Sequence, residues 1–462
     1  MSNQQTPQPN VREWTIQADT EPSVRVGIIL KQDAQKFIRI DIPDQPHHLI
    51  ADGFRIGVFT KTKIGLTLTG GKLVVSAGDE NVSAEKSVTI EPIEASTSAD
   101  DAMVVHDIIA GRGFHWQKRC DQALAGSAEI LVNPAGLILI NTLPLETYLA
   151  GVITAEMSGA CPVEFLKAQC VVARSWLLAM SESKHDADPF DRCNDDCCQR
   201  YQGIANTSGA AWRAVGESRG LVLLDDQGGV VDAVYSKNCG GISETPESVW
   251  GHSKPCVESI IDAVDSQPVA AFTPTTEQGF DTYLRAGEQL APHVYCSPSF
   301  VPPEVHSKYL GHVDEPDNYY RWSVTQSREE LEQGLSHRVS QLAGLSKLVD
   351  LTVTNRGVSG RAQCVRVDWL DGQNQPHQTD IAPEYNIRHA LHPGFLYSSA
   401  FAVEKKQSPT GELESITLHG LGWGHGAGLC QMGALGMGLA GKQLTEILSH
   451  YFPSAKQVCA YK

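Results

Sequence analysis

Apolar and polar positions alternate along residues 23–100 of the chain. Segments such as Val24–Leu30 and Gly70–Gly78 repeat apolar residues at short intervals and are interrupted by Gly. A repeat of two residues, broken by turn residues, is typical of half-buried β-strands. The pattern therefore predicts a small β-rich N-terminal domain over residues 23–100, after a polar tail over residues 1–22. The Ser/Ala/Asp-rich stretch 95–102 has the composition of a linker.

From Asn141 onward the pattern takes the period of a helix. Leu145, Leu149 and Val152 recur at spacings of four and three, and Glu156 occupies the next position on the same face. Pro162 is well suited to the first turn of a second helix. That helix has apolar residues at the same spacings: Leu166, Cys170, Ala173, Leu177 and Met180. We expect both helices to be core elements of a larger domain over residues 101–462.

The remaining segments predict a mixture of strands and helices. Hairpins are expected around Gly228–Gly229 and over residues 348–369, and a charged helix over residues 327–345. Residues 267–318 are rich in Pro, His and aromatics without a clear period, which indicates an insertion. The fold class expected is α+β, with a mixed β-rich and helical core that holds a substrate groove.

Composition narrows the classes of partner and compartment. The formal net charge is -17 and no basic block is present, which argues against a polyanion such as nucleic acid and favours a neutral substrate. No apolar run is long enough to span a bilayer, and the polar start Met1–Asn10 lacks the features of a secretory signal. Most of the twelve cysteines lie singly in apolar segments and are expected to be buried reduced thiols.

Glu156 is the first candidate for chemistry. If the apolar face holds its carboxylate against apolar surface, desolvation raises its pKa and leaves it protonated, as a general acid requires. The alternative is a helix-end Glu that extends into solvent. Lys167 and Arg174 lie seven residues apart on one face of the second helix, where they either bind substrate or pair with acidic neighbours.

A second candidate is a cluster of soft and borderline metal ligands. His185, Cys193, Cys197 and Cys198 lie within fourteen positions. This set suits a closed Cys3His zinc site of structural type, which would pin a loop and activate no water. The alternative is a set of loop thiols.

The third candidate is the glycine-rich segment Gly420–Ala434. Alternating glycines let a ligand approach the backbone closely, but the strand, helix and acidic residue of a dinucleotide-binding unit are missing. His425, flanked by glycines, is expected to touch substrate or another polar group. A minor alternative makes Cys239 a nucleophile with His425 as its base.

Three ordered motifs resemble one family, the SpoIID/LytB family of bacterial cell-wall proteins. The matching segments are 143–157 with 166–175, then 193–203, then 422–434; residues 233–241 and 249–251 are weaker matches between them. The resemblance covers most of the chain from about residue 105 onward. It implies a SpoIID-like core after the β-rich N-terminal domain.

The resemblance implies a lytic transglycosylase of peptidoglycan, with Glu156, the Glu of a Glu-Met pair, as its single acid and base. The product would be a 1,6-anhydro sugar, formed without a water nucleophile. We expect the glycan groove to be lined by Lys167, Arg174, Tyr201, His425 and Gln431.

The resemblance also implies a zinc site. At the position of Cys197 the family commonly has His, followed by a Cys and a Gln that correspond to Cys198 and Gln199. This chain thus substitutes one good zinc ligand for another. In the family the upstream His lies nearer to the first Cys than His185 does. The position of His185 is thus a second difference from the family pattern, after Cys197.

Two other functions compete with the enzyme. One is a non-catalytic glycan-binding module that modulates a partner amidase, the function for which the amidase-enhancer branch of the family is named. The other is a zinc-dependent hydrolase, which closed thiolate coordination disfavours. The family works on the cell envelope, whereas this sequence has no visible export signal. The chain therefore stays in the cytosol, is exported by another route, or lacks its leader here.

Overall fold

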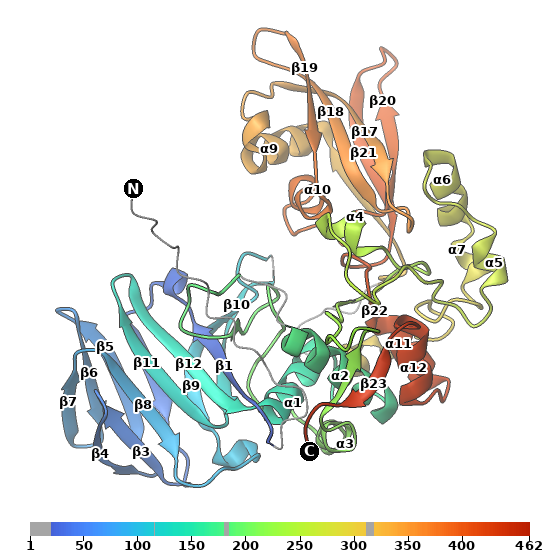
Figure 1. Ribbon diagram of the computed structural model, residues 1–462. Helices are drawn as coiled ribbons and strands as arrows, with labels where there is room; N and C mark the ends of the chain where they lie inside the picture. The colour runs from blue at the N-terminus through green and yellow to red at the C-terminus, as the bar shows by residue number, and fades with distance from the viewer. Residues whose placement is uncertain (1–19, 115, 180–183, 311–317) are drawn as a thin grey trace, which may run out of the picture.

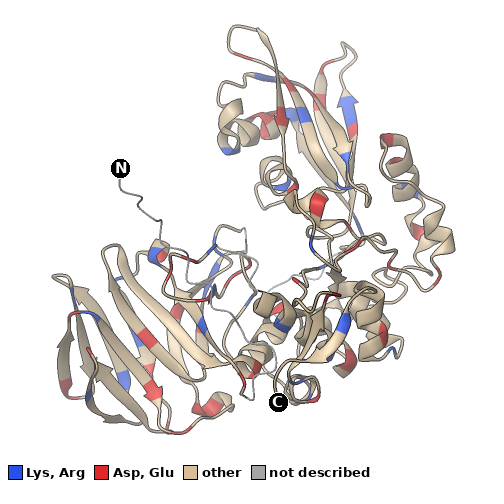
Figure 2. Ribbon diagram, in the orientation of Figure 1, with Lys and Arg blue, Asp and Glu red and all other residues tan. Residues whose placement is uncertain are grey.

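A computed structural model describes residues 20–114, 116–179, 184–310 and 318–462. Sheets and helices are both present, which confirms the α+β fold class. Figure 1 shows a β-sheet unit at the N-terminal end, a central part with most of the helices, and a separate C-terminal lobe drawn in orange. Lys and Arg lie scattered among Asp and Glu in all three parts (Figure 2). Within the described residues, no helix is long and apolar enough to span a membrane.

The N-terminal unit consists of two β-sheets, and it is larger than expected. The seven-stranded sheet has the order β13-β1-β12-β11-β8-β3-β4, and the six-stranded sheet the order β10-β9-β2-β5-β6-β7. Strands after residue 100 pair with strands before it, so the unit extends to Pro144 and the expected boundary at residue 100 is wrong. The expected linker lets the chain cross from one sheet to the other between β8 and β9. The strands are β1 (Ser23–Ile29), β2 (Phe37–Asp41), β3 (His47–Ala51), β4 (Phe54–Phe59), β5 (Lys63–Thr69), β6 (Lys72–Ala77), β7 (Glu80–Ala84), β8 (Ser87–Pro92), β9 (Met103–Ala110), β10 (Lys118–Leu124), β11 (Ser127–Asn133), β12 (Gly136–Pro144) and β13 (Arg192–Cys193), with 3-10 turns η1 (Lys31–Asp33) and η2 (Ala99–Asp101).

The central part is built on the two predicted core helices. α1 spans Leu145–Glu156, α2 spans Val163–Ala179, and the apolar face of α1 is fully buried. Residues 220–236 form one isolated bridge, Leu224 to Val230, in place of a regular hairpin. Instead β14 pairs with β23, and β15 pairs in parallel with β22. The other elements are α3 (Gly209–Glu217), β14 (Leu221–Leu224), β15 (Tyr235–Ser236), α4 (Pro246–Trp250), β22 (Leu429–Cys430), α11 (Gln431–Leu439), α12 (Leu444–Tyr451) and β23 (Lys456–Cys459).

The C-terminal lobe has its own hydrophobic core, which includes Trp322, Leu351 and Ile416. The range 101–462 is therefore not one domain, because two three-stranded sheets and two helices pack around this separate core. The hairpin over residues 348–369 is confirmed as β17 and β18. The expected insertion consists of short helices, and residues 311–317 lie outside the described part. The insertion consists of α5 (Gln267–Ala270), α6 (Glu277–Arg285), α7 (Gly287–Leu290), η3 (Pro303–Val305) and α8 (His306–Tyr309), whose buried apolar side chains belong to the main core. The lobe consists of β16 (Arg321–Ser327), α9 (Arg328–Arg338), η4 (Ser340–Leu342), β17 (Lys347–Arg356), β18 (Ala362–Leu370), β19 (Pro376–Ile381), α10 (Glu384–Leu391), β20 (Phe401–Gln407) and β21 (Leu413–Leu421).

Candidate functional site

A cavity of about 1090 Å³ lies where the three parts of the molecule meet. Its walls come from the N-terminal unit, from the central part around Glu156 and from α10 of the C-terminal lobe. Aromatic side chains contribute much of the lining, and such surfaces bind the apolar faces of ligands while a few polar groups orient them. The aromatic lining residues are Phe114, Trp116, Trp176, Tyr235, Trp250, Tyr385, Phe395 and Trp423.

Glu156 is the last residue of α1 and lines this cavity while remaining only 8% exposed. Its Oε1 accepts hydrogen bonds from the Arg200 backbone N–H (3.1 Å) and from the Tyr235 hydroxyl (3.0 Å). Its Oε2 accepts a longer bond from Gln431 Nε2 at 3.4 Å. The carboxyl group is thus held at the cavity wall, and the alternative of a Glu extended into solvent is wrong. Oε2 is the less tightly held oxygen.

Lys237 fixes the end of α1. Its buried ammonium donates to the backbone carbonyl of Glu156 at 2.8 Å and contacts Met157 Sδ at 3.3 Å. A cation at a helix C-terminus is favoured by the helix dipole and satisfies a carbonyl that has no partner within the helix. Tyr235 and Lys237 were both missed as site residues. Their only sequence signal was the weaker resemblance over residues 233–241.

The pairing of β15 with β22 brings the glycine-rich segment to Glu156. Tyr235 lies opposite Leu429 and Ser236 opposite Cys430, so Gln431, the first residue of α11, reaches the carboxyl group. The structure thus places Gln431 at the site, as it does His425, which also lines the cavity.

His425 is half-buried, and its ring contacts the backbone of two segments. Nδ1 accepts from the Ala427 backbone N–H at 3.1 Å, the ring also forms a hydrogen bond with the Tyr235 backbone, and its centroid lies 4.9 Å from that of the tilted Trp250 ring. Burial, with the charges of Arg361 and Arg388, lowers the pKa of His425 to about 3. The imidazole is therefore neutral near pH 7 and lies in the cavity wall without a positive charge. Cys239 lines no part of this cavity.

Asp196 is one of the carboxyl-bearing residues that line the cavity beside Glu156, and no sequence pattern singled it out. Its Oδ1 accepts from Arg200 Nε, whereas the buried Oδ2 has no hydrogen-bond partner in the described part of the chain. Burial, opposed by the charge of Arg200 and reinforced by that of Glu156, raises the pKa of Asp196 to about 7. The raised pKa brings the change of charge of Asp196 close to neutral pH, which is typical of groups at functional sites.

Three of the residues expected in the groove lie outside the cavity lining as described. Lys167 pairs with Glu164 at 2.5 Å and Glu217 at 2.8 Å, and fully buried Arg174 binds Glu146 through two nitrogens. Tyr201, also fully buried, donates to Asn141 Oδ1 at 2.9 Å. These side chains hold the helices together, because each is saturated by protein partners.

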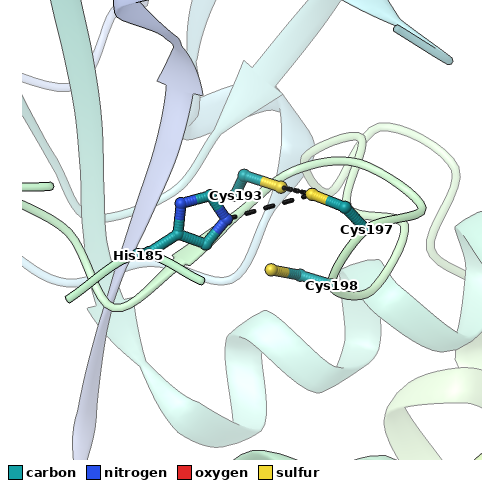
Figure 3. A group of neighbouring side chains, drawn as sticks. All are labelled: His185, Cys193, Cys197 and Cys198. Atoms are coloured by element: carbon teal, nitrogen blue, oxygen red, sulfur yellow. Dashed lines mark hydrogen bonds between the residues drawn. The ribbon is translucent and has the colours of Figure 1, made fainter. Parts of the chain in front are cut away.

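The predicted metal ligands form a compact group, which we call the His185 cluster (His185, Cys193, Cys197 and Cys198). Its four ligand atoms all lie within 4.8 Å of one another, and the side chains converge as Figure 3 shows. Cys193 is fixed by β13, which pairs in parallel with β1. The three cysteines also line the cavity.

The donor chemistry of the His185 cluster fits zinc. His185 Nδ1 donates to Asp188 at 2.9 Å, which leaves Nε2 directed at the sulfurs, 3.9 Å from Cys197 Sγ. A carboxylate behind a ligating imidazole is the usual second shell of a zinc site. Hydrogen bonds from Cys193 and Cys198 hold the pKa of the Cys197 thiol well below its usual range, which favours the thiolate that binds metal.

Two family models match the chain. The model described as stage II sporulation protein (SpoIID) matches residues 134–224, which include α1, α2 and the His185 cluster. A model of a domain of unknown function (DUF8618) matches residues 302–428, which include the C-terminal lobe.

Relatives among curated proteins point the same way. An uncharacterized protein of Brachyspira hyodysenteriae is 26% identical over 316 residues, 68% of this chain and 67% of that protein. The amidase enhancer of Bacillus subtilis is 26% identical over 66% of this chain, but the match spans only 39% of the enhancer. Stage II sporulation protein D of Bacillus amyloliquefaciens is 22% identical over 68% of this chain and 74% of its own length. The SpoIID model matches the segment that carries Glu156, and two of these relatives are an amidase enhancer and a stage II sporulation protein D, so the comparisons support the resemblance of the chain to the SpoIID/LytB family of cell-wall proteins.

Proposed function

We propose that this protein is a peptidoglycan lytic transglycosylase that cleaves the β-1,4 bond between N-acetylmuramic acid and N-acetylglucosamine. The observation that carries the proposal is Glu156, a nearly buried carboxyl group at the wall of a large aromatic-lined cavity. Aromatic faces suit the apolar faces of sugar rings, and the cavity volume is large enough for several of them.

In the first step, Glu156 donates its proton to the glycosidic oxygen. We assign the proton to Oε2, because Oε1 already accepts two hydrogen bonds and Oε2 has only the long contact to Gln431. Tyr235 and the Arg200 backbone N–H fix the rotamer of the carboxyl group, and Lys237 fixes the backbone that carries it. Such preorganisation is what positions a general acid within reach of its substrate.

In the second step, the Glu156 carboxylate takes the proton of the C6 hydroxyl of N-acetylmuramic acid while O6 forms a bond to C1. The C1–O bond to the leaving sugar breaks, and the proton delivered in the first step remains on that sugar. The product is the 1,6-anhydro sugar, and no water is consumed. Glycosidases that use water need a second carboxylate to activate it or to attack.

Asp196 allows the two chemistries to be separated, because it is a cavity carboxyl group whose pKa is raised to about 7 by burial together with the charge of Glu156. A water-using enzyme would lose its activity in Asp196→Asn and would give reducing-end sugars. Our proposal predicts that Asp196→Asn still forms the anhydro sugar. If this variant cleaves no glycan and the wild type gives reducing-end sugars, the protein is a hydrolase and the proposed transglycosylase activity is refuted.

At the His185 cluster we propose a structural zinc ion held by His185, Cys193, Cys197 and Cys198. The ion would cross-link the loop to β1 of the N-terminal sheet through Cys193 and so shape one wall of the cavity. Four protein ligands leave no open position, so the residues supply rigidity and no catalytic step depends on the ion.

The proposal is tested on purified glycan strands, both intact and stripped of peptides. Wild type should release anhydro-sugar products detectable by mass spectrometry, and Glu156→Gln should release none. Glu247→Gln is the matched control, because Glu247 lines the same cavity without contacting Glu156 in the described structure. Absence of anhydro products from wild type on both substrates would refute the enzyme.

The second candidate function is the modulation of a cell-wall amidase by glycan binding, which the similarity to an amidase enhancer favours. This function predicts that Glu156→Gln still binds glycan strands and still stimulates a purified amidase, while neither protein cleaves glycan. Co-sedimentation with peptidoglycan and an amidase assay with both proteins separate it from the transglycosylase.

A further inference from the structure

A second group of metal-binding side chains lies behind the wall that carries Glu156. Cys239, Asp262, Cys296 and Cys430 come from four separate segments, and all four are fully or almost fully buried. We call them the Cys239 cluster. Cys239 follows Lys237 by two residues and Cys430 immediately precedes Gln431, so the cluster adjoins two groups that hold Glu156.

Two distances between ligand atoms of the Cys239 cluster match those of a tetrahedral zinc site. Zn–S bonds of about 2.3 Å place two sulfurs of a tetrahedron about 3.8 Å apart, and a Zn–O bond of about 2.0 Å places oxygen and sulfur about 3.5 Å apart. Cys239 Sγ lies 3.8 Å from Cys296 Sγ and 3.3 Å from Asp262 Oδ2. All four ligand atoms lie within 4.8 Å of one another.

Backbone donors around the cluster stabilise thiolates. The N–H groups of Cys239 and Gly433 donate to Cys430 Sγ at 3.2 and 3.3 Å, and the Gly241 N–H donates to Cys239 Sγ at 3.4 Å. Cys430 is the N-cap of α11, where the helix dipole favours negative charge. Sulfurs that accept this many hydrogen bonds are prepared to bind a cation.

Contacts with Tyr451 and His450 orient the Asp262 carboxylate as in a metal ligand. Its Oδ1 accepts from the Tyr451 hydroxyl at 2.8 Å and lies 3.2 Å from His450 Nε2, which leaves Oδ2 directed at Cys239 Sγ. A fully buried carboxylate beside thiolates is costly unless a cation compensates the charge. Gly433 leaves room for Oδ2, because a Cβ at that position would collide with it.

We propose that the Cys239 cluster binds a second structural zinc ion through Cys239, Asp262, Cys296 and Cys430. Three soft sulfurs and one oxygen in a closed tetrahedral set select zinc among the common divalent ions. The ion ties β22 and the start of α11 to the segment after β15, and thereby fixes Gln431 and Lys237 against Glu156. This site is independent of the His185 cluster and of the catalytic proposal.

Metal counting on the full chain tests the proposal. After purification under reducing conditions and exposure to zinc, followed by buffer exchange, elemental analysis should give two zinc ions per chain for wild type. Cys193→Ser/Cys197→Ser and Cys239→Ser/Cys296→Ser should each lose one. Cys170→Ser, which removes a fully buried thiol outside both clusters, is the matched control and should retain both.

Variants of the Cys239 cluster could lose zinc because they misfold. A second measurement therefore uses a variant in which the Cys239 cluster is intact. Apo Cys193→Ser/Cys197→Ser titrated with Co²⁺ should bind one ion, with a sulfur-to-cobalt charge-transfer band and the strong visible bands of tetrahedral coordination. Absence of that band overturns the site. A Cys239–Cys296 disulfide found by mass spectrometry in freshly purified unreduced protein, or iron in place of zinc, overturns it as well.

Discussion

The buried pair of Arg174 and Glu146 gives a prediction whose size follows from the structure. Arg174 Nε and Nη2 donate to the two oxygens of Glu146 at 3.1 and 2.6 Å, and Nη1 donates to the Leu221 carbonyl at 2.8 Å. Against burial, which lowers it, the charge of Glu146 raises the pKa of Arg174. The pair joins α1 to α2, so its loss should reduce stability and leave the chemistry at Glu156 intact.

Removing one partner of a buried ion pair costs about 3–5 kcal/mol. Arg174→Met should lie near the lower end, because the Gly220 N–H and the Tyr461 hydroxyl still donate to Glu146, and a carboxylate can take up a proton. Glu146→Gln should lie near the upper end, because a guanidinium cannot lose its charge. The double variant should lose less than the sum, because the two residues interact directly.

Urea unfolding followed by circular dichroism measures these changes, and glycan-strand cleavage is measured on the folded proteins. Arg174→Met should cleave at the wild-type rate below its unfolding transition. If its unfolding free energy equals that of wild type while its KM for glycan rises, Arg174 binds substrate and our reading of the pair is wrong.

Three further predictions concern the site and its surroundings. Tyr235→Phe removes a hydrogen bond to Glu156 worth about 1.5–3 kcal/mol and should lower kcat for glycan cleavage between about tenfold and about a hundredfold; an unchanged kcat would contradict the role of Tyr235. His425 has a folded pKa of about 3 against 6.5, so its contribution to stability is present above pH 6.5 and lost as pH falls toward 3. His425→Gln should therefore flatten the pH dependence of Tm in that window, and an unaltered dependence would count against burial of a neutral imidazole. Lys167→Ala should cost only ~0.2–1 kcal/mol of unfolding free energy and leave cleavage intact, whereas a loss of glycan binding would return Lys167 to the groove.

The helical core was predictable from sequence because its signal is local. The face of α1 repeats with the helical period, so Leu145, Leu149 and Val152 were identified as core and Glu156 as its next position. The strands were recognisable by alternation, but the extent of the N-terminal unit was not. Whether Met103–Ala110 pairs with Phe37–Asp41 depends on contacts distant in sequence, which alternation alone does not encode.

The site was only partly predictable from sequence, because several of its contacts join residues that are distant in the chain. Tyr235 lies in a two-residue strand with no period, and Asp196 stands out only once burial and Glu156 act on it. Arg174 is a residue type that often binds ligands. Its ion-pair partner Glu146 lies 28 positions away on another helix, so the sequence pattern did not reveal the pair. The C-terminal lobe was likewise not recognisable as a separate part from sequence, because only the packed structure shows its own hydrophobic core.

In the proposed reaction Glu156 is the single acid and base, and no water is consumed. Glycan strands digested in water enriched in heavy oxygen test it most directly, with mass spectrometry of the new sugar ends. We expect anhydro ends without the label from wild type and no new ends from Glu156→Gln. Reducing ends that carry the label, lost in Glu156→Gln, would show hydrolysis and contradict it.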